Sequence, residues 1–291
     1  MRTRLAASAL SGSLIILALT GCGDDGDEPA AQGGAESAQA ADCSPEGLET
    51  LTEGTLTIGT DSPAFAPWFE DDDPTNGRGF ESAVAYAVAE ELGFAEDQVE
   101  WTVAAFNSII SPARKPFDLA LNQVSITEER RQAVDFTSGY YTAAQTVITV
   151  EGSPIDGATT VADLKDAKLG AQVGTTSLAA IEDVVQPDQD PATFDTNDVA
   201  KTQLQNGQVD GIVVDLPTAF YITAAELDDG AIVGQLPAVE GAEQDQFGIV
   251  LDKDSPLTDC ATAAVDALRE DGTLAELEDE YLAGAGAPVL E

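Results

Sequence analysis

The sequence predicts an α/β fold with two lobes, and three observations lead to this prediction. Apolar runs typical of strands alternate with segments of helical periodicity, an order typical of largely parallel sheets. The chain has 291 residues, which fits about two domains. Two strand-like runs, at 145–150 and 246–251, bracket the segment between them. We therefore expect one lobe, residues 150–245, to be inserted into another that comprises 43–149 and 246–291.

The first residues predict a lipoprotein signal peptide over 1–21. Two arginines precede an apolar stretch at 5–19 that is too short for a membrane span. It ends in LTGC, which resembles the bacterial lipobox, in which the cysteine, here Cys22, receives a diacylglyceryl group. The alternative is an ordinary signal peptide followed by a free cysteine. Residues 22–42 contain no large apolar side chain and predict a flexible tether, so we expect a lipid-anchored protein outside the cytoplasmic membrane.

The other two cysteines lie near the two ends of the predicted folded region. Cysteines outside the membrane tend to pair, and lipid would occupy Cys22. We therefore expect a disulfide between Cys43 and Cys260. The alternative is two free thiols.

The first lobe should begin with the apolar strand at 56–60. Residues 80–92 carry apolar side chains at helical spacing and are followed by a glycine, which predicts a helix. Residues 99–103 alternate polar and apolar side chains, as a half-buried strand does. Further strands are expected over 119–126 and 145–150.

A second set of elements begins after a Gly-Ser-Pro sequence. Thr160 with Asp163, and Thr273 with Glu276, form the pattern of a capping box at a helix start. The other expected elements are strands over 169–173, 209–215 and 246–251, a helix after the turn at 174–177, and helices over 198–207 and 257–268.

The composition excludes several classes of function. Lys and Arg number 12 against 53 Asp and Glu, a net charge of -41, which argues against nucleic-acid binding and against a basic lipid-binding patch. The chain has no histidine, which removes His-based catalysis and nearly every catalytic zinc site. We expect no metal and no cofactor. The acidity is typical of salt-adapted secreted proteins, and the alternative of a calcium site at 71–73 lacks the EF-hand spacing.

A segment around Arg130 has the chemistry of an anion site. The strand ending near Ser125 runs into a helix start with Arg130 in its first turn. Hydroxyl groups, backbone N–H groups and a guanidinium together suit a carboxylate or a phosphate. The alternative is that Thr127 caps an ordinary surface helix.

Two acidic residues end apolar strands. Asp215 follows the apolar run GIVV, and a carboxylate at this end of a parallel strand faces the ligand crevice, where it could bind an ammonium group. The alternative is that Asp215 caps the helix that follows. Asp61 ends another apolar strand, and Phe65 and Phe106 lie in or beside predicted loops, where they could line a small-molecule pocket or belong to the core.

Together these motifs resemble the bacterial extracellular solute-binding proteins of family 3, the amino-acid-capturing subunits of ABC importers. The resemblance covers about residues 43–283. It rests on IGTDSP, GFE, VSITEERR followed by VDFT, LGAQVGTTS and VVDLP.

The resemblance implies a two-lobed, type II periplasmic-binding-protein-like fold, with a two-strand hinge and a ligand trapped between the lobes. Arg130 would bind the ligand α-carboxylate and Asp215 its α-amino group. Phe65 and Phe106 would enclose the side chain, with Asp61 nearby. The groups that would assist at the carboxylate are Gln123, Ser125, Thr175, Thr176 and Ser177.

The same resemblance implies a monomeric binding protein that is not an enzyme. It would capture an amino acid, close around it and deliver it to the permease and ATPase of an ABC importer. Two alternatives remain open: a dehydratase acting on a cyclic carboxylate, and a surface lipoprotein that senses its ligand.

Overall fold

The computed structural model describes residues 43–238, 244–282 and 286–291. The predicted signal peptide, the predicted lipidation site Cys22 and the predicted tether over 22–42 lie outside the described residues. No helix in the described part of the chain is long and apolar enough to cross a bilayer.

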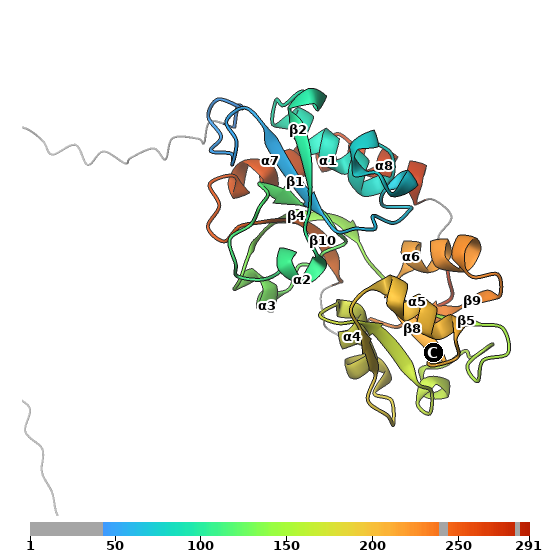
Figure 1. The fold of residues 1–291 in the computed structure, drawn as a ribbon. Helices are drawn as coiled ribbons and strands as arrows, with labels where there is room; N and C mark the ends of the chain where they lie inside the picture. Colours follow the sequence, from blue (N-terminus) through green and yellow to red (C-terminus); the bar gives the residue numbers. More distant parts are fainter. Residues whose placement is uncertain (1–42, 239–243, 283–285) are drawn as a thin grey trace, which may run out of the picture. The chain divides into compact units, whose positions relative to one another are not determined.

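The first lobe is built on a five-stranded sheet with the order β2-β1-β3-β10-β4 (Figure 1). Strand β1 is parallel to both neighbours, whereas β10 is antiparallel to both β3 and β4. The strands are β1 (Leu56–Thr60), β2 (Val99–Val103), β3 (Leu119–Ala120), β4 (Asp135–Thr142) and β10 (Gln246–Leu251).

The second lobe repeats this arrangement with the order β7-β6-β8-β5-β9. Strand β6 is parallel to both neighbours, and β5 is antiparallel to β8 and β9. Both sheets are therefore mixed rather than purely parallel. The strands are β5 (Gln145–Val150), β6 (Leu169–Gln172), β7 (Ala192–Phe194), β8 (Gly211–Asp215) and β9 (Gly230–Gln235).

Helices flank both sheets, which makes the fold α/β as predicted. They are α1 (Phe80–Glu91), α2 (Phe106–Ile109), α3 (Glu128–Arg131), α4 (Thr176–Ala180), α5 (Asn197–Gln205), α6 (Leu216–Tyr221), α7 (Thr258–Glu270) and α8 (Thr273–Tyr281). Helices α4 and α6 continue into the π-helical turns η5 (Ile181–Val185) and η6 (Ile222–Glu226).

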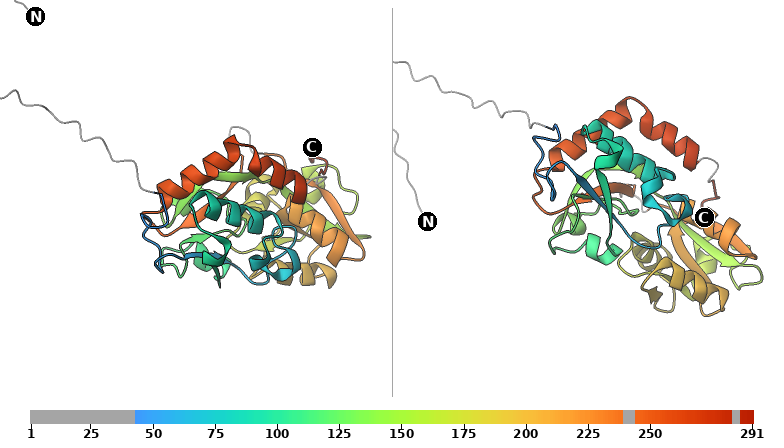
Figure 2. Two further views of the ribbon diagram at one scale, coloured as in Figure 1. Left: turned by 90° about the horizontal axis from the view of Figure 1, so that it is seen from above. Right: turned by 45° about the horizontal axis from the view of Figure 1, so that its top comes forward.

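The core of the first lobe lies between its sheet and helices α1, α7 and α8 (Figure 2). Phe80, Val84 and Val88 of α1 are fully buried, as their helical spacing predicts. The predicted disulfide between Cys43 and Cys260 is confirmed, with a Cα–Cα distance of 5.4 Å. It joins the start of the described chain to α7 and closes a loop of 217 residues, which restricts the unfolded chain.

The lobe boundaries differ from the predicted ones at two places. Strand β5, which the sequence assigns to the first lobe up to residue 149, hydrogen-bonds with β8 and β9 of the second sheet. The last residues also join the second lobe, because the N–H of Leu290 donates to the carbonyl of Gln235 in β9 and the N–H of Gln235 donates to the carbonyl of Pro288. Leu290 is buried in the core of the second lobe. The crossing from β4 to β5 therefore contains only two residues, Ala143 and Ala144.

Several elements differ from their predicted form. The strand expected over 119–126 ends at Ala120, since Gln123 adopts a φ of +49° and interrupts it. Residues 124–126 then run beside β10 through separate hydrogen bonds. The capping box at Thr160 is confirmed, but Thr273 is the first helical residue of α8, and Gly272 occupies the capping position with no side-chain bond.

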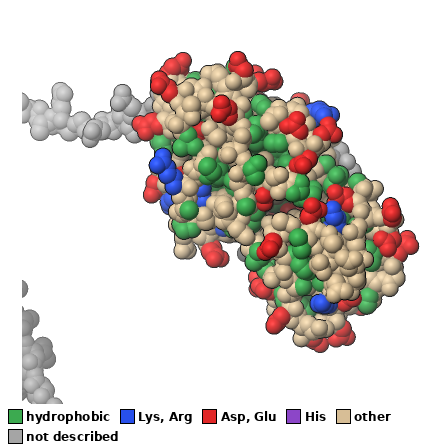
Figure 3. Space-filling view, in the orientation of Figure 1, with side chains coloured by type: hydrophobic (Ala, Val, Ile, Leu, Met, Phe, Trp, Pro, Cys, Tyr) green, Lys and Arg blue, Asp and Glu red, His purple; other side chains and the backbone are tan. Residues whose placement is uncertain are grey.

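Carboxylates are spread over the face seen in Figure 3, with few Lys or Arg side chains between them. In the acidic run at 71–73, Asp71 pairs with Arg78, and Arg78 also contacts Glu70 over 3.0 Å. No group of three or more Cys, Asp or Glu side chains in the described residues is placed to hold a metal ion.

Candidate functional site

One cavity collects most of the side chains that the sequence singles out. Its lining comes from the carboxyl ends of β1, β3, β6, β7 and β8 or the segments that follow them, and from α2 and α3. Ligands bind at such strand ends in open α/β sheets. Ser125 does not line it, but its Oγ lies 3.0 Å from Oγ1 of Thr176, which does. The predicted residues in the lining are Asp61, Phe65, Phe106, Gln123, Arg130, Thr175, Thr176, Ser177 and Asp215.

Arg130 points into this cavity from α3. Thr127 caps the helix by accepting from the backbone N–H of Arg130 over 3.1 Å, so the capping alternative is correct for Thr127. The Arg130 side chain nevertheless turns inward and is only 8% exposed. Its Nη1 donates to the carbonyl of Ser125 over 2.6 Å, and its Nη2 donates to the carbonyl of Gly174 over 2.9 Å.

The surroundings of Arg130 suit an anionic partner. Its guanidinium carbon lies 5.4 Å from the centre of the Phe106 ring. Burial lowers the pKa of Arg130, whereas Asp245 and Asp215 raise it. A guanidinium has five N–H donors, and the two carbonyls leave further donors for a carboxylate in the cavity.

The second lobe contributes three hydroxyl groups at the start of α4. Thr175 caps this helix by accepting from the N–H of Leu178 over 3.2 Å. Thr176 lies against Ser125 of the first lobe, as described above. Ser177 donates to Oε1 of Gln145 over 2.6 Å. The start of α4 therefore faces the Arg130 side of the cavity with polar groups.

Asp215 ends β8 and precedes α6. It stands at the capping position of α6, but its side chain makes no capping hydrogen bond. Instead its Oδ1 accepts from Nε2 of Gln145 over 2.9 Å. Burial raises the pKa of Asp215 to about 7; the Gln145 bond and Arg130 lower it, and Asp245 and Glu81 raise it further.

Asp61 and the two phenylalanines occupy the first-lobe side. The carboxylate of Asp61 accepts from the N–H of Ser62 over 2.8 Å and from the N–H of Phe106 over 3.1 Å. It thereby fixes the start of α2, where Phe106 is 6% exposed and belongs both to the core and to the cavity lining. Phe65 follows in the loop after β1 and also lines the cavity.

A buried carboxyl, Glu81, supports the Gln123 side of the cavity. Glu81 is completely buried and accepts from the N–H of Gln123 over 2.7 Å, from the Gln123 side-chain amide and from the hydroxyl of Tyr140. These bonds hold Gln123 in its left-handed conformation. Burial raises the pKa of Glu81 to about 7, although the bonds from Tyr140 and Gln123 lower it.

Replacing Glu81 should change how stability depends on pH. Between pH 4.5, its ordinary pKa, and about 7, folded Glu81 keeps a proton that the unfolded chain releases. Raising the pH through this window should therefore lower the free energy of unfolding of the ligand-free protein by up to about 3 kcal/mol relative to that of Glu81→Gln, because the amide of the variant does not titrate. Urea unfolding of both proteins at pH 5 and pH 8 measures the difference. Glu91→Gln, on the exposed part of α1, is the matched control, and a parallel pH dependence of wild type and Glu81→Gln would contradict the expectation.

Some lining residues were not predicted from the sequence. They are Ser62, Pro63, Asn122, Gln172, Thr196 and Asn197. Ser62, Pro63 and Gln172 lie within the motifs IGTDSP and LGAQVGTTS, but a motif does not by itself say which of its side chains reach a cavity. Thr196 directly precedes a helical segment, which predicts an N-cap. Asn197 carries no comparable signal, since an amide side chain at the end of an element is common.

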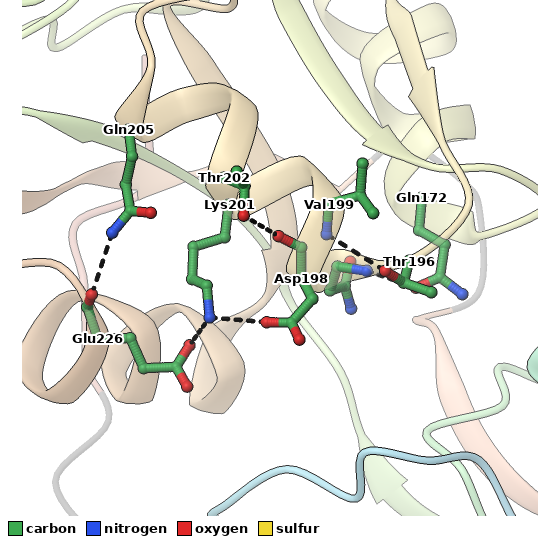
Figure 4. A network of polar contacts seen from close by, with 9 residues as sticks. Gln172, Thr196, Asp198, Val199, Lys201, Thr202, Gln205 and Glu226 are labelled. Carbon is green, nitrogen blue, oxygen red and sulfur yellow. Dashed lines mark hydrogen bonds and ion pairs between the residues drawn. The ribbon is translucent and has the colours of Figure 1, made fainter.

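Figure 4 shows how α5 is held beside the cavity. Thr196 accepts from the N–H of Val199 over 3.2 Å and so caps the helix. One turn further, Lys201 pairs with Asp198 and with Glu226 of η6, each over 2.7 Å. These contacts orient the N-terminus of α5, whose Asn197 N–H donates to Oε1 of Gln172 over 3.1 Å.

The chain is similar to known amino-acid-binding proteins over most of its length. The L-arginine-binding protein of Pseudomonas aeruginosa is 31% identical over 212 residues, 70% of this chain and 78% of that protein. The probable histidine-binding protein of Campylobacter jejuni is 28% identical over 236 residues, 80% of this chain and 87% of that protein. The L-cystine-binding protein TcyJ of Escherichia coli is 27% identical over 242 residues, 81% of this chain and 86% of that protein.

Solved structures share the fold. An ancestral arginine-binding protein bound to arginine has a TM-score of 0.65 and 30% identity, covering 79% of this chain and 99% of that one. The ancestral amino acid-binding protein AncCDT-1, a precursor of cyclohexadienyl dehydratase, has a TM-score of 0.62 and 28% identity, covering 78% of this chain and 95% of that one. Residues 56–284 match the family described as bacterial extracellular solute-binding proteins, family 3. With its two mixed sheets and a cavity at their strand ends, the chain belongs to this family.

Proposed function

We propose that this protein binds an amino acid in the cavity that holds Arg130 and Asp215. The observation that carries the proposal is that a buried guanidinium and a carboxylate line one cavity and influence each other's pKa. Arg130 takes the α-carboxylate, assisted by Ser125, Thr176 and the other polar groups at the start of α4. Asp215 takes the α-ammonium group. Such opposite charges, held apart by the fold, match the zwitterionic part of every α-amino acid.

The charge of the cavity favours a ligand whose side chain is positive. Among the described residues that line it, Asp61 and Asp215 are acidic and only Arg130 is basic. Once the α-carboxylate and α-ammonium group have paired with Arg130 and Asp215, the negative charge of Asp61 has no counter-charge among the lining residues. A cationic side chain between Phe65 and Phe106 would compensate it and could also form cation–π contacts. The names of the arginine- and histidine-binding relatives agree with this choice, whereas that of the cystine-binding relative does not.

Binding is coupled to closure of the two lobes. Each lobe supplies part of the polar shell, so the ligand is fully paired only when the lobes are together. The closed protein then delivers the amino acid to the permease and ATPase of an ABC importer. It acts as a monomer outside the cytoplasmic membrane, anchored through lipid on Cys22, and it does not transform its ligand.

Thermal unfolding with each of the twenty amino acids tests the proposal. A ligand that binds the folded state raises the unfolding midpoint by mass action. We expect lysine, arginine or histidine to raise it most, and aspartate and glutamate to leave it unchanged, at low and high salt. No shift with any amino acid would contradict the proposal. Chemical change of a bound compound, followed by mass spectrometry, would instead support the dehydratase alternative, and uptake that survives loss of the permease would favour a sensor.

A further inference from the structure

The indole of Trp68 connects the core of the first lobe to a helix of the second. Its ring is 1% exposed, and its centre lies 6.0 Å from that of Phe80, 5.5 Å from Tyr141 and 5.6 Å from Phe247. The ring is therefore fixed within the first core. Its Nε1–H donates to Oγ1 of Thr218 over 2.8 Å, and Thr218 belongs to α6. Figure 1 shows the chain after β1 passing beside α6.

Both partners of this hydrogen bond are buried. Thr218 is 5% exposed, and the aromatic rings around Trp68 offer its N–H no strong acceptor. A buried indole N–H requires a partner, and loss of that partner costs the full desolvation of the group. Movement of α6 away from the first lobe would break the bond, so it favours the closed arrangement.

The bond lies outside the ligand cavity. Neither Trp68 nor Thr218 lines the cavity that holds Arg130 and Asp215. By contrast, the contact of Arg130 with Gly174 joins the lobes through a residue to which we assign a role at the ligand. The Trp68–Thr218 bond can form whether or not an amino acid is bound.

We propose that the Trp68–Thr218 hydrogen bond is a latch between the lobes that sets the affinity for every ligand without contacting any of them. The inference rests on the proposed function, because it assigns the latch to the closure that completes the amino-acid site. When only the closed arrangement is competent to bind, the observed dissociation constant is the intrinsic one divided by the closed fraction. The latch raises this fraction in the ligand-free protein, so removing it weakens all ligands by the same factor.

Thr218→Val removes the hydroxyl group while keeping the shape of the side chain. We expect about five- to tenfold weaker binding of lysine, arginine and histidine alike, as for the loss of one buried hydrogen bond. The ratios between the dissociation constants of those amino acids that bind the wild-type protein should be the same in the variant. Small-angle X-ray scattering of the ligand-free variant should show a larger radius of gyration. Thr218→Ser keeps the hydroxyl group and should restore both properties.

Two further variants separate a latch from a general effect on stability. Thr223→Val is the matched control, because the Thr223 hydroxyl donates to the carbonyl of Ala219 within the same stretch and does not reach the first lobe. In a Trp68→Phe background, Thr218→Val should have no additional effect on either measurement. An unchanged radius of gyration for Thr218→Val would overturn the latch, as would losses that differ among the three ligands. If none of the three binds the wild-type protein, the preference for a cationic side chain fails, and if no amino acid binds, the proposed function fails. In both cases the scattering of the ligand-free variants still decides on the latch.

Discussion

Arg130→Ala is expected to weaken amino-acid binding by about 3–5 kcal/mol, a loss of at least a hundredfold. Arg130 is only 8% exposed, so the α-carboxylate of a ligand would be left in a buried position without its charged partner. The variant also loses the hydrogen bond to Gly174 that joins Arg130 to the second lobe. Isothermal titration calorimetry with the amino acid that most stabilises the wild-type protein measures the loss.

The neighbouring Arg131 provides a control with the same change of charge. Its side chain is 44% exposed and lies 3.8 Å from the carboxylate of Glu128, on the outside of the same short helix. Arg131→Ala should therefore leave the affinity close to that of wild type. Arg130→Lys keeps the charge but cannot form two parallel hydrogen bonds with a carboxylate. Its affinity should therefore lie between those of Arg130→Ala and Arg131→Ala. Equal affinities of Arg130→Ala and Arg131→Ala would rule out the carboxylate assignment.

Asp215→Asn should weaken amino acids by about 2–5 kcal/mol and their des-amino analogues much less. The reason is that Asp215 is assigned to the α-ammonium group, which a des-amino analogue lacks. Lysine and 6-aminohexanoate form a suitable pair, because they share the carboxylate and the side-chain ammonium group. Equal losses for the two compounds would show that Asp215 has another role, such as orienting Gln145.

The same variant should remove a dependence of affinity on pH. Burial raises the pKa of Asp215 to about 7 in the ligand-free cavity, where Asp245, Glu81, Arg130 and Gln145 surround it. An ammonium group pairs with the ionised carboxylate, so ligand binding must displace a proton below this pH. The affinity of the wild-type protein should fall as the pH is lowered from 8 to 5. Asp215→Asn should show a smaller fall.

Local sequence patterns predict those elements whose signals lie within a few residues. The strand over 99–103, the helical spacing in α1 and the capping pattern at Thr160 match the structure, although Val103 at the end of β2 is exposed rather than half-buried. The strand expected over 119–126 fails because Gln123 is held at positive φ by Glu81, a residue 42 positions away. The edge strands β4, β7 and β9 were not predicted, since their short or mixed sequences form strands only beside a partner.

Part of the cavity lining could be predicted from the sequence, because its signals are also local. Asp61 and Asp215 end apolar strands, and the carboxyl ends of parallel strands meet at one edge of a sheet. The side to which a residue turns was not predictable from its position. Arg130 and Arg131 are adjacent in one short helix, yet one is buried in the cavity and the other is exposed.

The sequence alone therefore determined the alternation of strands and helices through its hydrophobic periodicity, and the family through its motifs. It also determined the pairing of Cys43 with Cys260, through the number of cysteines. All three are local or compositional properties of the chain. Only the tertiary structure decided that β5 and the C-terminal residues belong to the second lobe, because strand partners are chosen by burial and backbone hydrogen bonding across the fold. It also decided that Trp68 meets Thr218, 150 residues away. No periodicity encodes such a contact, since it arises only when two separately folded cores come together.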